Sequence, residues 1–493
     1  DGTYYENVDI YKRLTIRSEN GSANCVVHAA NSNDYVFNVS ANNVTIKGFT
    51  VTGATGFGKA GIYLYKSNNC RIENVNASNN YDGIELSSSS NNTIANNTVL
   101  DNWWDGILLK YSGNNILANN IVLDNYHGIH LKYSGNSTIA NNTASNGYDG
   151  IRLYYSDNNT IANNTASNNW DGIYLEYSSS NIIANNNISS NNDDGIELRY
   201  SSNNTIANNN ISSNYYGDGI HLEYSSSNNI MANNTVSDSK YGIHLDHSSN
   251  NIMANNSMTD NTYNFCLYGE QDSHFDNNID TTNTVDGKPI YYIKNASNTV
   301  YDSSTNAGVF YCIWCNNVTV KDLTLTKNGY GVFFWKTNNS KIINNTASNN
   351  WWDGIHLYSS SNNTIANNNA SSNHYGDGID LRYSSNNTIA NNTVSNNWWD
   401  GIRLYKSSSN IIANNNASSN AGNGIYLYES SSNTIANNNI SSNNHNGIDL
   451  RYSSNNSIAN NNVSSNNWYG INLYESSNNT IVNNTVSSNN EYG

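Results

Sequence analysis

Residues 172–194 read GIYLEYSSSNIIANNNISSNNDD, and this stretch decides the fold. Its aliphatic residues alternate at Ile173 and Leu175 and then stand singly at Ile183 and Ile188, with clusters of Asn, Ser and Gly between them. Alternation with a period of two indicates short β-strands, and no part of the stretch has the spacing of an amphipathic helix. Three such strands cannot bury a core alone, so the unit must stack on copies of itself.

The same unit recurs along the chain. Within two blocks, the tetrapeptide Gly-Ile-x-Leu or a close variant returns every 22 to 24 residues, beginning at Gly61, Gly83, Gly106, Gly128, Gly150, Gly172, Gly195, Gly219 and Gly242, and again at Gly331, Gly354, Gly378, Gly401, Gly424, Gly447 and Gly470. Between the blocks, Asn264-Phe-Cys-Leu267 and Gly308-Val-Phe-Tyr311 keep the spacing. The repeat therefore continues through the gap, and one coil there is enlarged.

This periodicity predicts an all-β chain: a single right-handed parallel β-helix, a pectate-lyase-like solenoid of about 21 coils. We expect opening coils over residues 1–60 and regular coils over 61–267. An enlarged irregular coil or insertion should occupy 268–306, and regular coils should follow over 307–493 with no evident C-terminal cap.

Composition excludes several classes of protein. Hydrophobic residues make up 37% of the 493 residues and charged residues 12%, and the net charge is −16. A nucleic-acid partner is not expected, because phosphate binding needs clustered Lys and Arg. The longest apolar runs are far too short for a membrane helix, so no direct membrane span is expected in this segment.

Asparagine recurs in register after the second strand of each unit, as Ile-Ala-Asn-Asn or a close variant, for example at Asn141 and Asn142. Stacked amides can hydrogen-bond from coil to coil as a ladder, and the second Asn of each pair is predicted to point inward. The turns need left-handed or tight conformations, for which Gly and Asn are suited. We therefore expect a positive φ at Gly195.

The chain resembles the NosD-like, or carbohydrate-binding-and-sugar-hydrolase, superfamily of parallel β-helix repeats, notably its archaeal cell-surface members. The repeat itself, the opening Asp1-Gly-Thr-Tyr-Tyr-Glu-Asn-Val8 and the segment Asn283-Thr-Val-Asp-Gly-Lys-Pro-Ile-Tyr-Tyr292 carry the resemblance, which covers essentially the whole chain. It is specific for the fold and weak for activity, because this fold serves enzymes, adhesins and passive scaffolds alike.

Catalytic motifs of sugar-cleaving β-helices are missing. Of the polygalacturonase-like set, only Asp193-Asp194 is present, and the nearest match to its histidine motif is Tyr126-His-Gly-Ile-His130. The single Pro excludes a pectate-lyase-like Arg-x-Pro-x-x-Arg. We therefore predict no enzymatic activity, no catalytic residue and no cofactor.

Outward positions of the first strand should form a column of side chains running from coil to coil. Its densest part holds Glu197, Arg199, His221, Glu223, His244, Asp246 and His247. Histidine and carboxylate one coil apart could bind Zn or Cu, which makes His221, His244 and His247 weak metal candidates. The alternative is charge pairing across strands on a solvated face.

An aromatic ridge precedes the first strand of many coils. It comprises Trp103, Trp104, Tyr126, Tyr148, Trp170, Tyr216, Trp351, Trp352, Tyr375, Trp398, Trp399 and Trp468, and an Asp often follows the aromatic residue. Exposed aromatic residues in a line mark interaction surfaces. They could stack on sugars, form a lateral protein interface or only cover the turns.

Acceptor sequences for N-glycosylation occur 29 times. Those placed just before the second strand should be exposed enough to carry glycan: Asn91, Asn158, Asn203, Asn362, Asn386, Asn455 and Asn478. This density is typical of an extracellular or cell-surface glycoprotein.

Five cysteines, Cys25, Cys70, Cys266, Cys312 and Cys315, are too few for a disulfide framework. They are expected to be buried or disulfide-paired structural residues. The spacing of Cys312 and Cys315 leaves a functional thiol pair or metal ligand as the alternative.

The sequence thus favours an extracellular structural repeat protein that carries glycans. We expect it to self-associate, laterally through the aromatic ridge and head-to-tail through its coil ends, as a filament, sheath or surface layer. The alternatives are a polysaccharide-binding or polysaccharide-cleaving protein and a copper- or zinc-binding surface protein.

Overall fold

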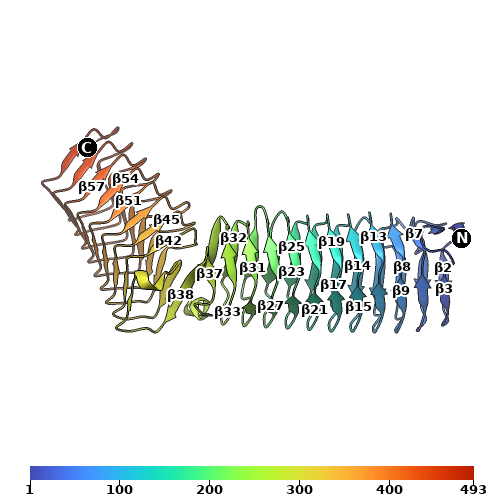
Figure 1. The fold of residues 1–493 in the computed structure, drawn as a ribbon. Coiled ribbons are helices and arrows are strands. Elements are labelled where there is room, and N and C mark those ends of the chain that lie inside the picture. Colours follow the sequence, from blue (N-terminus) through green and yellow to red (C-terminus); the bar gives the residue numbers. More distant parts are fainter. Residues whose placement is uncertain (493) are drawn as a thin grey trace. The chain divides into compact units, whose positions relative to one another are not determined.

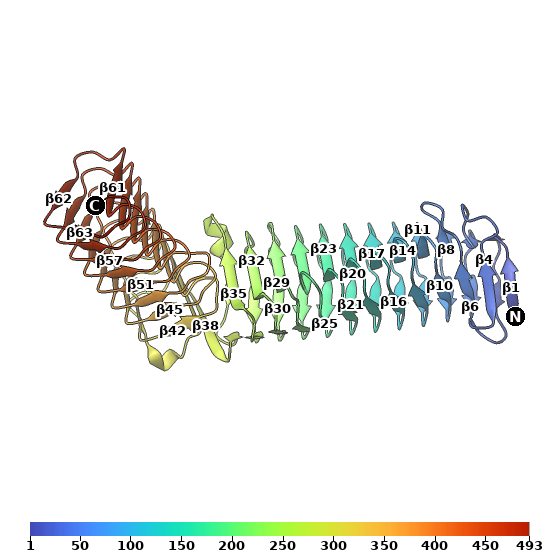
Figure 2. The ribbon, with the colours of Figure 1, turned by 90° about the horizontal axis from the view of Figure 1, so that it is seen from above.

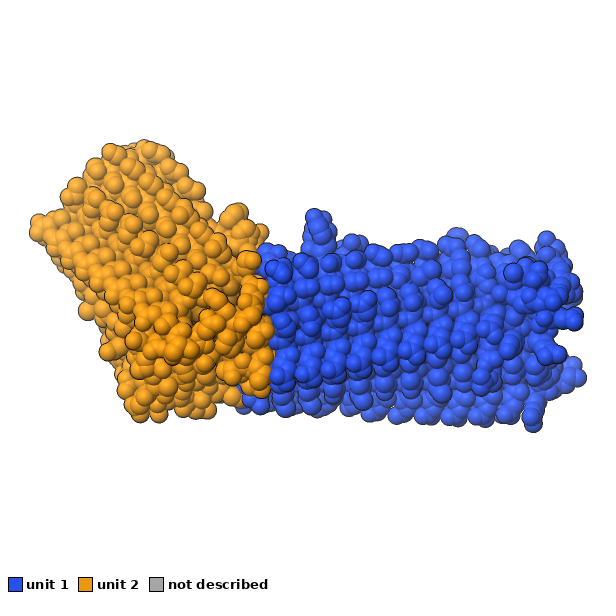
Figure 3. Space-filling model, in the orientation of Figure 1, with its two compact units in different colours: residues 1–262, 267–278 blue, residues 263–266, 279–493 orange. Residues whose placement is uncertain are grey.

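The computed structural model describes residues 1–492, and every coil of it is built from short parallel strands. The chain divides into two compact units (Figure 3). Unit 1 comprises residues 1–262 and 267–278, and unit 2 comprises residues 263–266 and 279–493. The predicted parallel β-helix is confirmed in each unit.

Unit 1 has three sheets, and each coil contributes one strand to each sheet (Figures 1 and 2). The first sheet contains β2 (Val8–Ile10), β5 (Phe37–Val39), β8 (Ala60–Tyr65), β11 (Asp82–Ser87), β14 (Asp105–Lys110), β17 (His127–Lys132), β20 (Asp149–Tyr154), β23 (Asp171–Glu176), β26 (Ile196–Arg199), β29 (Asp218–Glu223) and β32 (Tyr241–Asp246). The second sheet runs from β3 (Thr15–Arg17) to β33 (Ile252–Ala254), and the third from β1 (Gly2–Tyr5) to β34 (Ser257–Thr259).

Unit 2 repeats this arrangement. Its first sheet contains β38 (Lys288–Lys294), β40 (Val309–Ile313), β43 (Val332–Trp335), β46 (Ile355–Tyr358), β49 (Ile379–Arg382), β52 (Ile402–Tyr405), β55 (Ile425–Tyr428), β58 (Ile448–Arg451) and β61 (Ile471–Tyr474). The second runs from β39 (Val300–Tyr301) to β62 (Thr480–Val482), and the third from β42 (Thr324–Thr326) to β63 (Thr485–Ser487).

The predicted enlarged coil, residues 268–306, contains the irregular elements. It holds two 3₁₀ turns, η1 (Asp272–Phe275) and η2 (Ser303–Thr305), and a hairpin in which β37 (Thr284–Val285) pairs antiparallel with β38. No helix among residues 1–492 is both long enough and apolar enough to cross a membrane.

The core of each coil is a small set of aliphatic side chains. In the coil that begins at Gly172, the side chains of Ile173, Leu175, Ile183 and Ile188 are all fully buried. Each contacts its equivalents one coil before and after, because the parallel register aligns identical positions. The low apolar content of the sequence follows from this narrow core.

A ladder of buried amides runs beside this core. The predicted inward Asn is confirmed: Asn142 is buried, its Nδ2 donates to the Leu117 carbonyl (3.0 Å) and to Asn164 Oδ1 (3.0 Å), and its Oδ1 accepts from the Asn120 backbone N–H (2.9 Å). The preceding Asn141 is exposed with φ of 59°. Each Asn pair therefore combines one left-handed turn residue with one buried linker between coils.

The expected positive φ at Gly195 is wrong. In the coil before Gly195, residues 172–194, the residues with a positive φ are Tyr177, Ser180, Asn185 and Ser190. Gly195 is required by close approach instead, because a Cβ there would lie 2.6 Å from the Gly219 carbonyl oxygen and 2.5 Å from a methyl of Ile211.

All five cysteines are buried. Cys312 and Cys315 belong to the hydrophobic core of unit 2, and burial raises the pKa of the Cys312 thiol well above its ordinary value. Burial thus favours a structural role for Cys312, whereas the hydrogen bond with Cys312 lowers the pKa of the Cys315 thiol.

Candidate functional site

The outer face of the first sheet of unit 1 carries the chemically active side chains. Along each strand the two aliphatic residues point inward and the residue between them points outward. The strand register places His130 beside Leu108 on one side and Arg152 on the other. The predicted column is therefore present.

Each unit has a column of this kind. In unit 1 it comprises Glu85, Leu108, His130, Arg152, Tyr174, Glu197, His221 and His244, and in unit 2 His356, Asp380, Arg403, Tyr426, Asp449 and Asn472. Several of these side chains are well covered: Glu85 is 9% exposed, His356 4% and Asp380 not at all.

Asp residues at the start of these strands, or just before them, supply a second, buried column of carboxylates. The Asp105 backbone N–H donates to Asp82 Oδ1 (3.0 Å), and the Asp218 N–H donates to Asp194 Oδ1 (2.6 Å). Burial, reinforced by the Asp105 carboxylate, raises the pKa of Asp82 to about 8. The sequence showed that Asp follows the aromatic ridge, but it did not indicate that these carboxylates would be buried next to the histidines.

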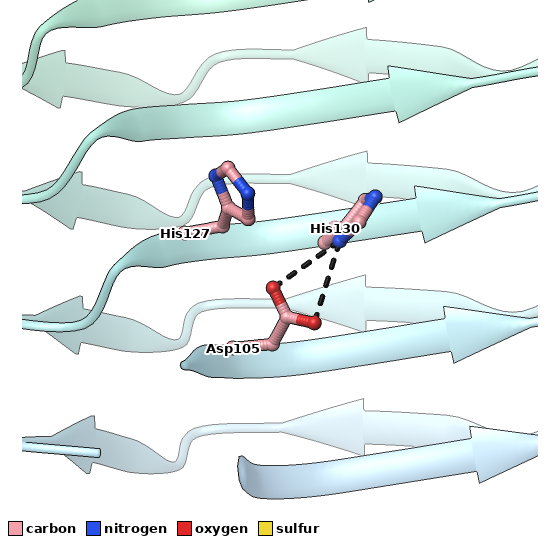
Figure 4. Close-up of side chains that lie close together, drawn as sticks. All are labelled: Asp105, His127 and His130. Atoms are coloured by element: carbon pink, nitrogen blue, oxygen red, sulfur yellow. Dashed lines mark hydrogen bonds and ion pairs between the residues drawn. The ribbon is translucent and has the colours of Figure 1, made fainter. Parts of the chain in front are cut away.

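Asp105, His127 and His130 form the first cluster on this face (Figure 4). His130 Nδ1 lies 3.2 and 3.3 Å from the two carboxylate oxygens of Asp105, and His127 Nδ1 lies 3.1 Å from Asp149 Oδ2. The two imidazoles meet edge to face with centroids 5.1 Å apart. A carboxylate-held imidazole can transfer a proton or bind a metal through its other nitrogen.

A groove of about 480 Å³ lies over this cluster, lined by Trp104, Tyr126, His127, His130, Lys132, Arg152, Tyr154 and Glu176. Arg152 is already paired with Asp149 (3.0 Å) and Glu176 (3.4 Å). Lys132 Nζ lies 5.7 Å from the centroid of the Tyr154 ring. The groove therefore presents a mixed polar and aromatic lining, with Lys132 as its more available cation.

The aromatic ridge is a stack of rings. Trp104, Tyr126, Tyr148 and Trp170 follow one another with centroids 4.5, 5.2 and 6.0 Å apart and near-parallel planes. Ten of the twelve predicted ridge residues are exposed, namely Trp103, Trp104, Tyr126, Tyr148, Trp170, Tyr216, Tyr375, Trp398, Trp399 and Trp468, whereas Trp351 and Trp352 are half-buried. The four stacked rings partly cover one another's faces. Elsewhere in the ridge Trp103 is 74% exposed, and the pairs Trp351–Tyr375 and Tyr375–Trp398 are tilted by 52° and 43°.

A second ladder of rings borders the other side of the same sheet. It comprises Tyr111, Tyr133, Tyr155, Tyr177, Tyr200 and Tyr224, stacked at 4.7 to 5.5 Å. Each of these tyrosines has a φ near 50°, a conformation that only Gly and Asn adopt readily. The same position is left-handed in coils without a tyrosine there, for example at Lys66, Ser88 and Glu429, so the conformation belongs to the turn and not to the ring stack.

The second cluster of unit 1 brings together two of the predicted metal candidates. His221 and His244 stack with parallel rings 4.8 Å apart, beside Asp194, Glu197 and Asp218. His247 lies outside these groups, with its Nδ1 2.6 Å from Asp246 Oδ1 and its ring against His274.

Unit 2 has a more deeply buried counterpart. His356 Nδ1 lies 2.8 Å from Asp353 Oδ2 and 3.4 Å from Asp380 Oδ2, and Arg382 donates to Asp380 (2.6 Å). Burial opposes the charge on His356, but its two carboxylate partners outweigh burial and raise its pKa. In this cluster Arg382 already supplies a positive charge next to the Asp380 carboxylate.

The seven predicted glycan acceptors all lie on one edge of the coils. Asn91, Asn158, Asn203, Asn362, Asn386, Asn455 and Asn478 are each exposed and each adopt a left-handed conformation with φ between 57° and 60°. Every one stands at the same position of its coil, directly before the second strand.

Three stretches of the chain, residues 25–147, 218–341 and 330–486, match the family described as the right handed beta helix region. The chain belongs to this family. Residues 105–235 also match the model of the periplasmic copper-binding protein NosD. The resemblance to NosD-like β-helices is thereby confirmed.

One curated relative is a cell surface glycoprotein of Methanothermus fervidus, 40% identical over 78 residues. That match covers 16% of this chain and 12% of the relative. The chain thus spans only a small part of that protein.

Solved structures with a similar backbone include the alginate lyase AlyGC, at 11% identity and a TM-score of 0.46, with 99% of this chain and 96% of that one covered. The mannuronan C-5 epimerase AlgE4 A-module of Azotobacter vinelandii has 13% identity and a TM-score of 0.35, with 68% and 88% covered. These likenesses concern the fold alone.

Proposed function

We propose that this chain is a non-enzymatic structural β-helix of the cell surface, which carries N-linked glycans along one edge and associates laterally with further copies. The observation that carries the proposal is the column of seven exposed acceptor asparagines on one edge of the coils. Exposed acceptors of this kind are accessible to glycan transfer in a secreted protein.

The two sequence similarities support an extracellular or cell-surface location. One is to a cell surface glycoprotein and the other is to a periplasmic protein. The amide ladder suits a structural role, because each buried Asn hydrogen-bonds to the coil before it and to the coil after it.

Lateral association would use the aromatic ridge. Its exposed rings recur in successive coils of each unit, so a second copy can contact several of them at once. Trp103 is the most exposed ring of the ridge at 74%. Head-to-tail association stays a prediction.

Light scattering over a concentration series tests lateral association. Replacing Trp103 and Trp398 by Ala should weaken it at least about tenfold, which corresponds to about 1.4 kcal/mol. Tyr11→Ala is the matched control, because Tyr11 is 75% exposed and lies outside the ridge. A monomer at all concentrations, or equal loss in the control, would contradict the proposal.

A second candidate function is polysaccharide binding in the groove over His130. The specific observation is its size and lining, which includes the cations Lys132 and Arg152 and the rings of Trp104 and Tyr126. An anionic oligosaccharide would complement the two cations. Binding of oligouronates that Lys132→Ala abolishes would support this function, and equal binding by the variant would exclude the groove.

A further inference from the structure

One coil of unit 2 interrupts the series of rings along the aromatic ridge. Backbone hydrogen bonds place Trp399, Gly422, His445 and Trp468 at the same position of four successive coils. His445 and Trp468 stack with centroids 4.5 Å apart, whereas Gly422 and the preceding Ala421 carry no ring. The series therefore has a break one coil high, which we call the ring gap.

The backbone keeps the ring gap open. A Cβ at Gly422 would lie 2.5 Å from Asp400 Oδ1 and 2.8 Å from the carbonyl carbon of Trp399, so a side chain at this position would need the coils to shift. Ala421 stands where the previous coil has Trp398, and it supplies only a methyl group. No side chain of this coil can therefore take the place of the missing ring.

A hollow of about 290 Å³ lies over the ring gap. Its lining includes Trp398, Trp399, Arg403, Tyr426, His445 and Arg451. Asp400 also lines it, and this carboxylate already accepts two hydrogen bonds from Asn423. The volume lies at the low end of the range for small-molecule sites, which suits a single ring.

Two arginines give the hollow its chemical character. Arg403 lies 3.7 Å from Asp377 Oδ2, which is longer than a hydrogen bond, and its guanidinium carbon lies 5.9 Å from the centroid of the Trp399 ring. Arg451 donates to Asp449 (3.1 Å) and keeps 43% of its side chain exposed. A guanidinium attracts the face of an aromatic ring, and that of tryptophan most strongly. The hollow therefore fits an aromatic ring that is accompanied by negative charge.

The most exposed rings of the chain itself are candidates for this occupant. In residues 1–492, five aromatic side chains are at least 70% exposed, namely Tyr11, Phe57, Trp103, Tyr215 and Tyr492. Phe57, Tyr215 and Tyr492 each contact another ring. Tyr11 is followed by Lys12 and Arg13, which the arginines of the hollow would repel. Trp103 is the one that remains.

Trp103 also has the complementary charge beside it. The ring is 74% exposed and lies outside the stack that the neighbouring Trp104 joins. Asp101, two residues earlier, and Asp124, at the same position of the next coil, are both exposed. Two carboxylates thus accompany the ring, and their charge is opposite to that of the two arginines in the hollow.

We propose that Trp103 of one copy of the chain inserts into the ring gap of a second copy, between Trp399 and His445. This inference rests on the proposed lateral association and names the two surfaces that meet. Because the two surfaces differ, the contact is heterologous. Each copy in a pair still offers one free ring or one free ring gap, so the assembly grows with concentration and does not stop at a dimer.

Filling the ring gap tests the inference. Ala421→Trp places a ring where the previous coil has Trp398, so the variant should fold but leave no room for Trp103. Sedimentation velocity over a concentration series should show association of the wild type, and association at least about tenfold weaker in Ala421→Trp and in Trp103→Ala. Tyr11→Ala should associate as the wild type does. Circular dichroism shows whether each variant is folded, and Ala421→Tyr replaces Ala421→Trp if the latter unfolds.

A mixture of the two defective variants gives the sharpest readout. Trp103→Ala keeps the ring gap and Ala421→Trp keeps the inserting ring, so an equimolar mixture should form a complex of one copy of each and nothing larger. A mixture that stays monomeric would overturn the inference. Association of Ala421→Trp as tight as that of the wild type would overturn it too, and would leave lateral association standing. A wild type that is monomeric at all concentrations would remove both proposals.

Discussion

Removing one amide from the buried ladder should destabilise the coils around it far more than removing its exposed neighbour. In Asn142→Ala, the Asn120 backbone N–H loses its acceptor (2.9 Å) and the Leu117 carbonyl loses a donor (3.0 Å). Each buried group left unsatisfied costs about 1–3 kcal/mol, so the free energy of unfolding should fall by about 2–5 kcal/mol.

The matched control is Asn141→Gly in unglycosylated protein. Asn141 is exposed with φ of 59°, a conformation that Gly adopts without strain, so stability should change by less than about 1 kcal/mol. Urea unfolding followed by tryptophan fluorescence compares the variants, and hydrogen exchange over residues 116–145 localises the effect. Equal stability of the two variants, with unchanged exchange at Asn120, would refute the role assigned to the ladder.

Three further outcomes follow from the structure. Burial raises the pKa of the Glu85 carboxyl to about 7, against 4.5 in the unfolded chain, so its contribution to stability is complete below pH 4.5 and is lost as pH rises through 7. Between pH 4.5 and 8 the wild type should therefore lose about 3 kcal/mol more of its free energy of unfolding than Glu85→Gln does. Thermal unfolding measures this difference, and parallel pH profiles of the two proteins would contradict it. Gly195→Ala should lower stability by about 1–3 kcal/mol through overpacking against Ile211, and an unchanged melting temperature would show that the close approach is not limiting. Trp103→Ala, which removes an exposed ring, should leave the melting temperature within about 1 °C of the wild type, and a larger drop would mean that the ring supports the fold.

Periodicity made the fold predictable. A repeat of 22 to 24 residues with alternating Ile and Leu allows only stacked coils, and stacking then fixes which residues share a column. The neighbours of His221, namely Glu197 and His244, follow from counting alone, and the structure places them as counted.

Burial of the polar columns could not be predicted in the same way. Asp194, just before β26, and Asp218, at the start of β29, are buried beside the histidines, and this depends on local backbone geometry rather than on repeat spacing. The left-handed tyrosines were also missed, because this turn position is left-handed for several residue types, for example at Tyr177, Lys66 and Glu429, and the sequence gives no sign of it. The need for glycine at residue 195 was predicted correctly, but the predicted reason, a positive φ, was wrong. Glycine is needed there because a Cβ would lie too close to neighbouring atoms.

Glycopeptide mass spectrometry of the protein taken from the surface of its native cells tests the central claim most directly. A cell-surface glycoprotein predicts glycan at exposed acceptor asparagines, such as Asn91, Asn158 and Asn386. Recovery of these peptides only in unmodified form, or of the protein only from inside the cell, would contradict it.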